Sequence, residues 1–230
     1  MNGYIIFGIS KGLGKEIYED LSKNNIVIGL TSGEDQFDNN IIHYSLSNEF
    51  NETNTDLKNI LKLINKYKNY KFTIIFNSAI YDQVDDTISD KKKILDINFF
   101  NQIELCNFLE KKIKLNISKL IFFSSFEALK KFSKLEYYRL SKILFISEYF
   151  KRLNSKKSIK IKLFILGGIK TETYNKNSRS NKNFILKLIP KNLIEAKNFI
   201  IKKINTNGSE IIYYPKIYYY LNIMYNLLKK

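Results

Sequence analysis

The feature that most constrains the fold is a regular alternation of short apolar runs with amphipathic segments. The runs are rich in Ile, Phe, Leu and Val, and their near-continuous apolarity suits strands that are buried on both faces. They span Tyr4–Gly8, Ile26–Leu30, Ile41–Ser45, Phe72–Phe76, Leu120–Ser124, Ile161–Leu166 and Glu210–Tyr214. Segments with helical periodicity separate them near residues 12–22, 54–68, 88–114, 135–153 and 192–205. This alternation predicts a single doubly wound α/β domain, with a mainly parallel seven-stranded sheet covered by helices on both faces.

The glycines are concentrated where the first predicted strand ends and the first helix begins, in the stretch GISKGLG. Glycine allows a tight turn there, and the backbone N–H groups at the helix start can approach a pyrophosphate. We interpret the turn as a phosphate-binding loop; the alternative is a glycine-bearing turn without a ligand. The residues assigned to it are Gly8, Ser10, Lys11, Gly12, Leu13 and Gly14.

The stretch EYYRLSK places Tyr138 and Lys142 four residues apart, so on a helix both side chains lie on one face. A phenol beside an ammonium group can act as an acid/base pair. The same spacing occurs at Tyr67/Lys71 and Tyr225/Lys229, so the spacing alone is uninformative. Other residues must single out this pair.

The G-x-x-x-G-x-G spacing resembles that of the short-chain dehydrogenase/reductase family, whose Rossmann-type fold binds NAD or NADP. The resemblance continues along the chain in the family's order: FNSAIY after the fourth strand, LDINFF in the next helix, a serine thirteen residues before Tyr138, and the turn LGGIKT. The matching residues are Asn77, Ala79, Asn98, Ser125, Gly167 and Thr171.

Four positions depart from the family pattern. Ile80 replaces a glycine, Leu166 replaces a proline, and Ser45 stands where an acidic residue is common. The segment SSFEALK also lacks the glycine that usually follows the serine. These departures concern cofactor seating and loop shape and spare the proposed catalytic residues.

The chemistry follows from the tyrosine hydroxyl, which can exchange a proton with a substrate oxygen while a hydride moves to or from nicotinamide. A free phenol has a pKa of about 10, and the nearby Lys142 is expected to lower the pKa of Tyr138. The resemblance implies that Lys142 also contacts the nicotinamide ribose, that Ser125 orients the substrate oxygen, and that Asn98 holds a water for proton relay. Alternatively, Ser125 bonds only to loop backbone and Asn98 is a locally bonded buried amide.

The end of the second strand, GLTSGE, favours NADP over NAD. An acidic residue there would repel a 2′-phosphate, whereas Thr31 and Ser32 can hydrogen bond to one. Lys11 matches the place where NADP-preferring family members carry a basic residue, although it is alternatively one more surface lysine. NAD stays open.

We therefore expect an NADP(H)-dependent oxidoreductase that acts on a small-molecule or lipid-linked carbonyl or alcohol. Some family members whose C-terminal segments are similar to residues 216–230 suggest a role in cell-envelope sugar or lipid metabolism. The alternatives are a catalytically silent dinucleotide-binding or sensor protein, and a sugar epimerase or dehydratase. The net charge of +16 raises nucleic acid as a partner. The lysines are spread along the chain without a recognisable module, so a solvated surface is the better interpretation.

The remaining composition restricts the setting. One cysteine, Cys106, and one histidine, His43, exclude an internal disulfide and a Cys/His metal cluster, which favours the cytoplasm. By resemblance, residues 170–190 form a substrate lid within a catalytic domain over residues 1–215, and family members commonly pair through the Tyr/Lys helix, so we expect a homo-oligomer. Residues 216–230 form an amphipathic tail that packs on its own domain or a partner subunit, or lies in the inner membrane face.

Overall fold

The computed structural model describes residues 2–31, 41–44, 46, 55–81, 87–111, 113–131, 133–155, 158–170, 191–217 and 220. The strands are β1 (Asn2–Phe7), β2 (Ile26–Thr31), β3 (Ile41–His43), β4 (Lys71–Phe76), β5 (Ile117–Ser125), β6 (Lys160–Leu166), β7 (Ile169–Lys170), β8 (Lys191–Asn192) and β9 (Glu210–Tyr214). The helices are α1 (Gly12–Leu21), α2 (Thr55–Lys66), α3 (Ile88–Leu95), α4 (Asn101–Lys111), α5 (Glu136–Ser155) and α8 (Leu193–Ile204). A π-helical turn, η1 (Asp96–Phe100), and a 3-10 turn, η2 (Phe126–Leu129), complete the described elements.

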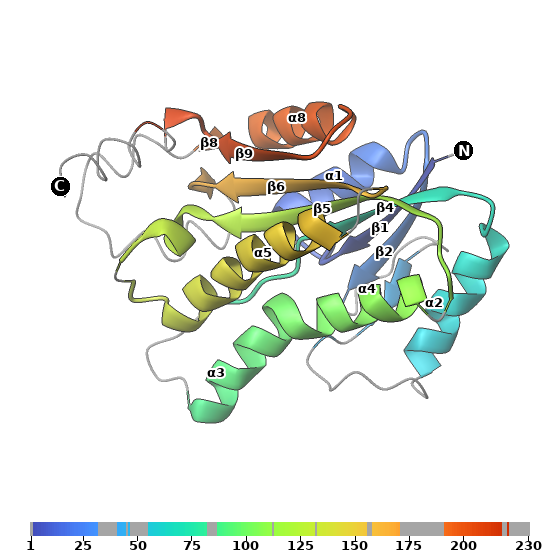
Figure 1. Cartoon of the computed structure of the whole chain (residues 1–230), viewed down its shortest axis with the longest axis horizontal. Coiled ribbons are helices and arrows are strands. Elements are labelled where there is room, and N and C mark those ends of the chain that lie inside the picture. The colour runs from blue at the N-terminus through green and yellow to red at the C-terminus, as the bar shows by residue number, and fades with distance from the viewer. Residues whose placement is uncertain are drawn as a thin grey trace.

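Seven strands form one sheet in the order β3-β2-β1-β4-β5-β6-β9, and every neighbouring pair is parallel (Figure 1). The chain runs outward from β1 to β3 on one side, then returns and runs outward from β4 to β9 on the other. The direction therefore reverses between β1 and β4, which is where doubly wound sheets bind ligands at the carboxyl ends of their strands. The predicted doubly wound parallel sheet is confirmed.

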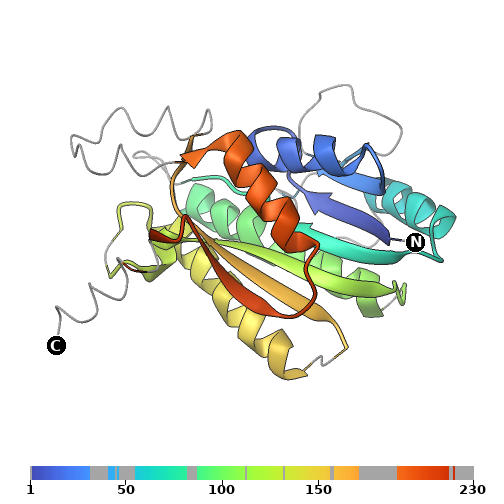
Figure 2. The same ribbon diagram turned by 90° about the horizontal axis from the view of Figure 1, so that it is seen from above.

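Helices cover both faces of the sheet, and the alternation of side chains along each strand feeds two cores. In β1, Ile5 and Phe7 enter the core that α2, α4 and α5 cover, whereas Tyr4 and Ile6 enter the core under α1 and α8. Figure 2 shows α8 and α1 on one side of the sheet and α4 and α5 on the other. Burial on both sides explains why the strands are almost continuously apolar.

The helix predicted over residues 88–114 is interrupted in the structure. Helix α3 gives way to the π-helical turn η1, where the N–H of Asn101 donates to the carbonyl oxygen of Asp96, five residues earlier, and α4 follows. Such a turn holds one more residue than an α-helical turn and is frequent at functional sites. Here it carries Asn98, whose side chain is completely buried.

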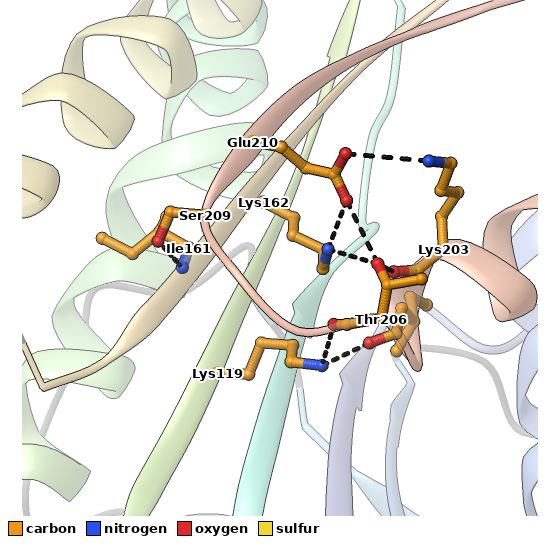
Figure 3. Close-up of polar contacts among 8 residues, drawn as sticks. Lys119, Ile161, Lys162, Lys203, Thr206, Ser209 and Glu210 are labelled. Atoms are coloured by element: carbon orange, nitrogen blue, oxygen red, sulfur yellow. Dashed lines mark hydrogen bonds and ion pairs between the residues drawn. The ribbon is translucent and has the colours of Figure 1, made fainter.

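A polar cluster joins the amino ends of β5, β6 and β9 (Figure 3). Because the strands are parallel, this end of the sheet lies opposite to the glycine turn. Lys162 is 0% exposed, and its ammonium group donates to Thr206 Oγ1 at 2.8 Å and to the carboxylate of Glu210. Lys119 donates to the carbonyl oxygens of Ile204 and Thr206 where α8 ends. These bonds satisfy a buried charge and the free carbonyls of a helix end, and they fasten α8 to the sheet.

Some expectations fall outside the described residues. Positions 171–190 of the expected lid do so, although Ile169 and Lys170 pair in parallel with Lys191 and Asn192 on either side of them. Of the expected tail, only residues 216, 217 and 220 are described. Ser45, one of the departures from the family pattern, also lies outside the described residues. No helix in the described ranges has the length and apolarity that crossing a membrane requires.

Candidate active site

Several of the predicted site residues lie at the carboxyl ends of neighbouring parallel strands. Gly8 follows β1, Asn77 follows β4, Ser125 ends β5 and Gly167 follows β6. Because the strands are parallel neighbours, these ends share one edge of the sheet, which includes the reversal between β1 and β4. Ala79 lies two residues beyond Asn77, and Thr171 lies outside the described residues.

The glycine turn brings β1, α1 and the residue after β4 into close contact. Gly8 has a φ of +77° and Gly12 a φ of +59°, which other residues rarely adopt. A Cβ on Gly14 would lie 2.0 Å from the carbonyl oxygen of Gly8 and 2.3 Å from Asn77 Nδ2. Asn77 Nδ2 donates to that same carbonyl at 2.9 Å. Any larger side chain at position 14 would therefore break the turn.

Helix α1 begins without a side-chain cap. Lys11, at the cap position, is extended and makes no capping bond, and the first turn carries no acidic residue. Free N–H groups and the helix dipole favour an anion here, and the exposed Lys11 adds positive charge. Ser10 is half-buried, whereas Leu13 is buried in the core beneath α1. Thr31 is only 3% exposed, and Ser32 lies outside the described residues.

Tyr138 lies in the first turn of α5 and is 7% exposed. Its hydroxyl hydrogen bonds with the hydroxyls of Tyr81 and Ser125. The ring of Tyr81 stacks on the ring of Tyr138, with 4.3 Å between centroids and 29° between planes. Burial raises the pKa of Tyr138 well above its ordinary value of 10, and the bond with Ser125 opposes that rise. Tyr138 is therefore protonated at neutral pH.

Lys142 lies one turn further along α5 and is 3% exposed. Its Nζ donates to the carbonyl oxygen of Phe123 at 3.2 Å and lies 5.3 Å from the centroid of the Tyr138 ring. Burial lowers the pKa of Lys142 from 10.5 to about 7. The lowered pKa expected for Tyr138 is not found in this arrangement, because burial raises the pKa of the phenol and outweighs the influence of Lys142.

Asn98 joins the loop after β4 to helix α5. Its Oδ1 accepts from the N–H of Ile80 at 2.7 Å, while its Nδ2 donates to the carbonyl of Ile80 at 2.9 Å and to Ser141 Oγ at 3.2 Å. Ser141 Oγ in turn donates to the carbonyl of Tyr138 at 2.6 Å. The interpretation of Asn98 as a locally bonded amide describes its side chain well, and its role in a water relay stays a prediction.

Ser125 has two kinds of partner. Its Oγ accepts from the N–H of Glu127 at 3.2 Å and so caps η2, as the structural alternative predicted. The same hydroxyl also bonds with Tyr138, which places it beside the phenol oxygen.

Two of the departures from the family pattern lie near the site and leave its backbone unstrained. Ile80 is not among the residues with positive φ, and Leu166 ends β6 before Gly167, whose N–H donates to Tyr214 at 2.7 Å.

Two residues that contact Tyr138, Tyr81 and Ser141, were not predicted from the sequence. Tyr81 is one of 16 tyrosines, and its only signal is that it follows FNSAI at the end of the fourth strand. Tyr137 differs from its neighbour Tyr138 because Lys91 Nζ lies 5.6 Å from its ring centroid. Tyr137 therefore packs between α5 and α3.

The chain matches the model of the NAD dependent epimerase/dehydratase family over residues 4–202. It therefore belongs to this family, within the short-chain dehydrogenase/reductase superfamily, and the resemblance found in the sequence is confirmed. A search of curated proteins finds no match.

Solved structures with the same fold are more distant in sequence. A short-chain dehydrogenase family protein from Francisella tularensis is 23% identical, with a TM-score of 0.70 over 93% of this chain and 97% of that one. One from Burkholderia cenocepacia, in complex with NADP, is 14% identical, with a TM-score of 0.71 over 98% and 92%. A 4-hydroxyisoleucine dehydrogenase complexed with NADH is 18% identical, with a TM-score of 0.71 over 93% and 96%.

Proposed function

We propose that the protein is an NADP(H)-dependent oxidoreductase that transfers a hydride between nicotinamide and a carbonyl or alcohol substrate. The observation that carries this proposal is the hydrogen-bonded pair of Ser125 and Tyr138 at the carboxyl edge of the sheet, with Lys142 beside it. Two hydroxyl groups in contact can bind a single substrate oxygen from two directions. Family membership supports the same reaction type.

The residues of the glycine turn fit a dinucleotide. The uncapped start of α1, the left-handed Gly8 and Gly12, and the exposed Lys11 form a site that favours a pyrophosphate. By family resemblance, Lys142 would contact the nicotinamide ribose. When bound, nicotinamide supplies or accepts the hydride.

The residues of the chain perform the proton transfer. In the reducing direction, Ser125 donates to the carbonyl oxygen and Tyr138 gives that oxygen its proton, so the product is an alcohol and Tyr138 becomes a phenolate. The raised pKa of Tyr138 keeps the phenol protonated before the step. The charge on Lys142, whose pKa is lowered to about 7, favours the phenolate electrostatically after the step.

The preference for NADP rests mainly on charge. Lys11 is exposed next to the start of α1, and no acidic residue occupies the first turn. Thr31 contributes less than the sequence suggested because it is almost completely buried. The NADP complex of the Burkholderia cenocepacia protein supports the same choice, whereas the NADH complex of 4-hydroxyisoleucine dehydrogenase keeps NAD as the alternative.

The test is to measure NADPH binding and turnover separately. The chain has no tryptophan, so nicotinamide fluorescence can report binding against a low protein background. Turnover is then followed by nicotinamide absorbance with a panel of aldehydes, ketones and keto sugars. Binding with turnover of at least one carbonyl supports the proposal. Binding without any turnover would identify a silent dinucleotide-binding protein, and absence of binding would refute both.

A sugar epimerase or dehydratase is the second candidate, because the matching family carries that name. Such an enzyme oxidises its substrate transiently, and the cofactor returns to its starting state in each cycle. Incubation with nucleotide sugars, followed by separation of the products, would reveal isomerised or dehydrated sugar without net change in nicotinamide absorbance.

We also propose that the substrate belongs to cell-envelope sugar or lipid metabolism and reaches the enzyme at a membrane surface. The support is the amphipathic pattern of residues 216–230, in which the described Ile217 and Tyr220 are exposed. Deletion of residues 216–230 should abolish co-sedimentation with anionic liposomes. Equal sedimentation with and without the tail would contradict the membrane proposal while leaving the proposed reaction intact.

A further inference from the structure

Tyr81 occupies a defined place beside the reacting hydroxyl. It follows Ile80, whose main chain Asn98 holds at both its N–H and its carbonyl group. This clamp fixes the loop so that the Tyr81 ring stacks on Tyr138 and the two hydroxyls hydrogen bond. Tyr138 thus has hydroxyl partners on two sides, Ser125 at the end of β5 and Tyr81 after β4.

We propose that Tyr81 is a positioning residue for Tyr138, which holds the Tyr138 oxygen through its hydroxyl and returns a solvent proton to it after each transfer. This inference rests on the proposed function of Tyr138 as the acid of the reaction. Tyr81 is half-buried, whereas Tyr138 is almost completely buried, so Tyr81 is the member of the pair that solvent reaches more readily.

The proton balance is simple. The O–H bond of Tyr138 breaks as an O–H bond forms on the substrate oxygen. The hydroxyl of Tyr81 donates to the resulting phenolate, and this charge-assisted bond is stronger than a bond between neutral hydroxyls. The Tyr81 proton then moves to the Tyr138 oxygen, and water supplies a proton to Tyr81. Both phenols end neutral, and one solvent proton has been consumed for each carbonyl reduced.

The charges around the pair are compatible with this sharing. Burial raises the pKa of both phenols, and the carboxylate of Glu127 adds to the rise for each. The bond between the phenols lowers the pKa of Tyr81 and raises that of Tyr138, so once the pair has lost one proton, the remaining proton is favoured on the Tyr138 oxygen. Within the described part of the chain, Lys142 on α5 and Ser125 on β5 also face Tyr138.

The relay that family resemblance predicts is less well supported by the contacts. Lys142 is buried and donates to Phe123, and both N–H bonds of the Asn98 amide are used by Ile80 and Ser141. The main-chain carbonyl of Asn98 accepts from Gln102 Nε2 at 3.0 Å. Tyr81, by contrast, bonds directly to the hydroxyl that must be reprotonated.

The test compares Tyr81→Phe with Tyr137→Phe. The first variant removes the hydroxyl and keeps the ring that stacks on Tyr138; the second removes a hydroxyl from the adjacent tyrosine, which packs against Lys91. Each is assayed with NADPH and the best carbonyl from the substrate panel. Nicotinamide fluorescence and thermal melting confirm that both variants bind NADPH and fold.

Tyr81→Phe should lower kcat about tenfold to a hundredfold, the effect of losing a hydrogen bond to a charged group, and leave KM nearly unchanged. The rate of the wild-type enzyme should depend on the heavy-water fraction along a curve, because two protons move, whereas Tyr81→Phe should give a straight line. Wild-type kinetics in Tyr81→Phe, or equal losses in both variants, would overturn the inference. Absence of turnover in the wild-type protein would instead refute the proposed function, and this inference with it.

Discussion

The side-chain amide of Asn98 bonds to both main-chain polar groups of Ile80, at 2.7 Å to the N–H and 2.9 Å to the carbonyl. This pair of hydrogen bonds links the π-helical turn to the loop after β4. Through Ser141, the same amide reaches the main chain of Tyr138. Asn98 therefore sets the distance between the loop that carries Tyr81 and the helix that carries Tyr138.

Replacement of Asn98 should loosen both sides of the site. Asn98→Ala leaves the polar groups of Ile80 and the hydroxyl of Ser141 without this partner, and we expect a loss of about 2 kcal/mol in unfolding free energy. We also expect kcat to fall by more than about tenfold, because small misplacements of reacting groups are costly. Denaturant unfolding and steady-state kinetics measure the two effects.

A double-mutant cycle distinguishes positioning from general destabilisation. If Asn98 acts by holding the Tyr81 loop, the effects of Asn98→Ala and Tyr81→Phe on kcat should be strongly non-additive, because each disrupts the same contact. Fully additive effects would show that the two residues act independently.

The buried lysine makes stability depend on pH in a predictable direction. Between about pH 7 and 10.5, Lys142 binds a proton in the unfolded chain but not in the folded protein, so its contribution to unfolding free energy grows with pH. The slope is at most about 1.4 kcal/mol per pH unit. Wild-type protein should therefore lose stability relative to Lys142→Met as the pH falls through this window. Melting curves of both proteins test this, with Lys58→Met at an exposed position as the control for lost charge.

The cluster at the opposite edge should respond unequally to its two charges. Glu210→Gln leaves the fully buried Lys162 without its counter-charge and should cost about 3 kcal/mol. Lys162→Met removes the buried charge, and Glu210, whose side chain is 34% exposed, can be hydrated. That variant should stay within about 1 kcal/mol of wild type. Equal losses of unfolding free energy in the two variants would show that the unpaired buried charge of Lys162 is not the main cost of breaking the pair.

Cofactor preference should depend on Lys11. The substitution Lys11→Glu reverses the charge at the start of α1 and should raise the dissociation constant for NADPH about tenfold while changing that for NADH much less. Fluorescence titration with both dinucleotides measures the ratio. If wild-type protein already binds NADH markedly more tightly than NADPH, the NADP assignment is wrong.

The sequence predicted the strands of the seven-stranded sheet, their alternation with helices and the glycine turn, because these depend on local patterns. Apolar runs identify buried strands, and parallel pairing brings their ends together. The π-helical turn at Asn98 was not predicted, since the apolar pattern continues across it. Tyr81 was missed because a single tyrosine in a tyrosine-rich chain carries no signal until the loop is placed.

The raised pKa of Tyr138 was also not predicted, again because it depends on how the chain packs. The spacing of Tyr138 and Lys142 shows that they share a helix face, but it does not show how deeply that face is buried. In the structure, burial outweighs the attraction between the two groups, so it raises the pKa of the phenol and lowers that of the amine. The charge state of such a pair depends on long-range packing, which the local sequence does not describe.

If Tyr138 transfers the proton that accompanies hydride transfer, loss of its hydroxyl must slow the first turnover itself, which a single-turnover comparison measures. Tyr138→Phe and Tyr137→Phe are each loaded with NADPH and mixed with the best carbonyl from the panel, and nicotinamide absorbance is followed. Tyr138→Phe should bind NADPH normally and oxidise it at least about a hundredfold more slowly than wild type, whereas Tyr137→Phe should match wild type. Oxidation by Tyr138→Phe at the wild-type rate would contradict the account.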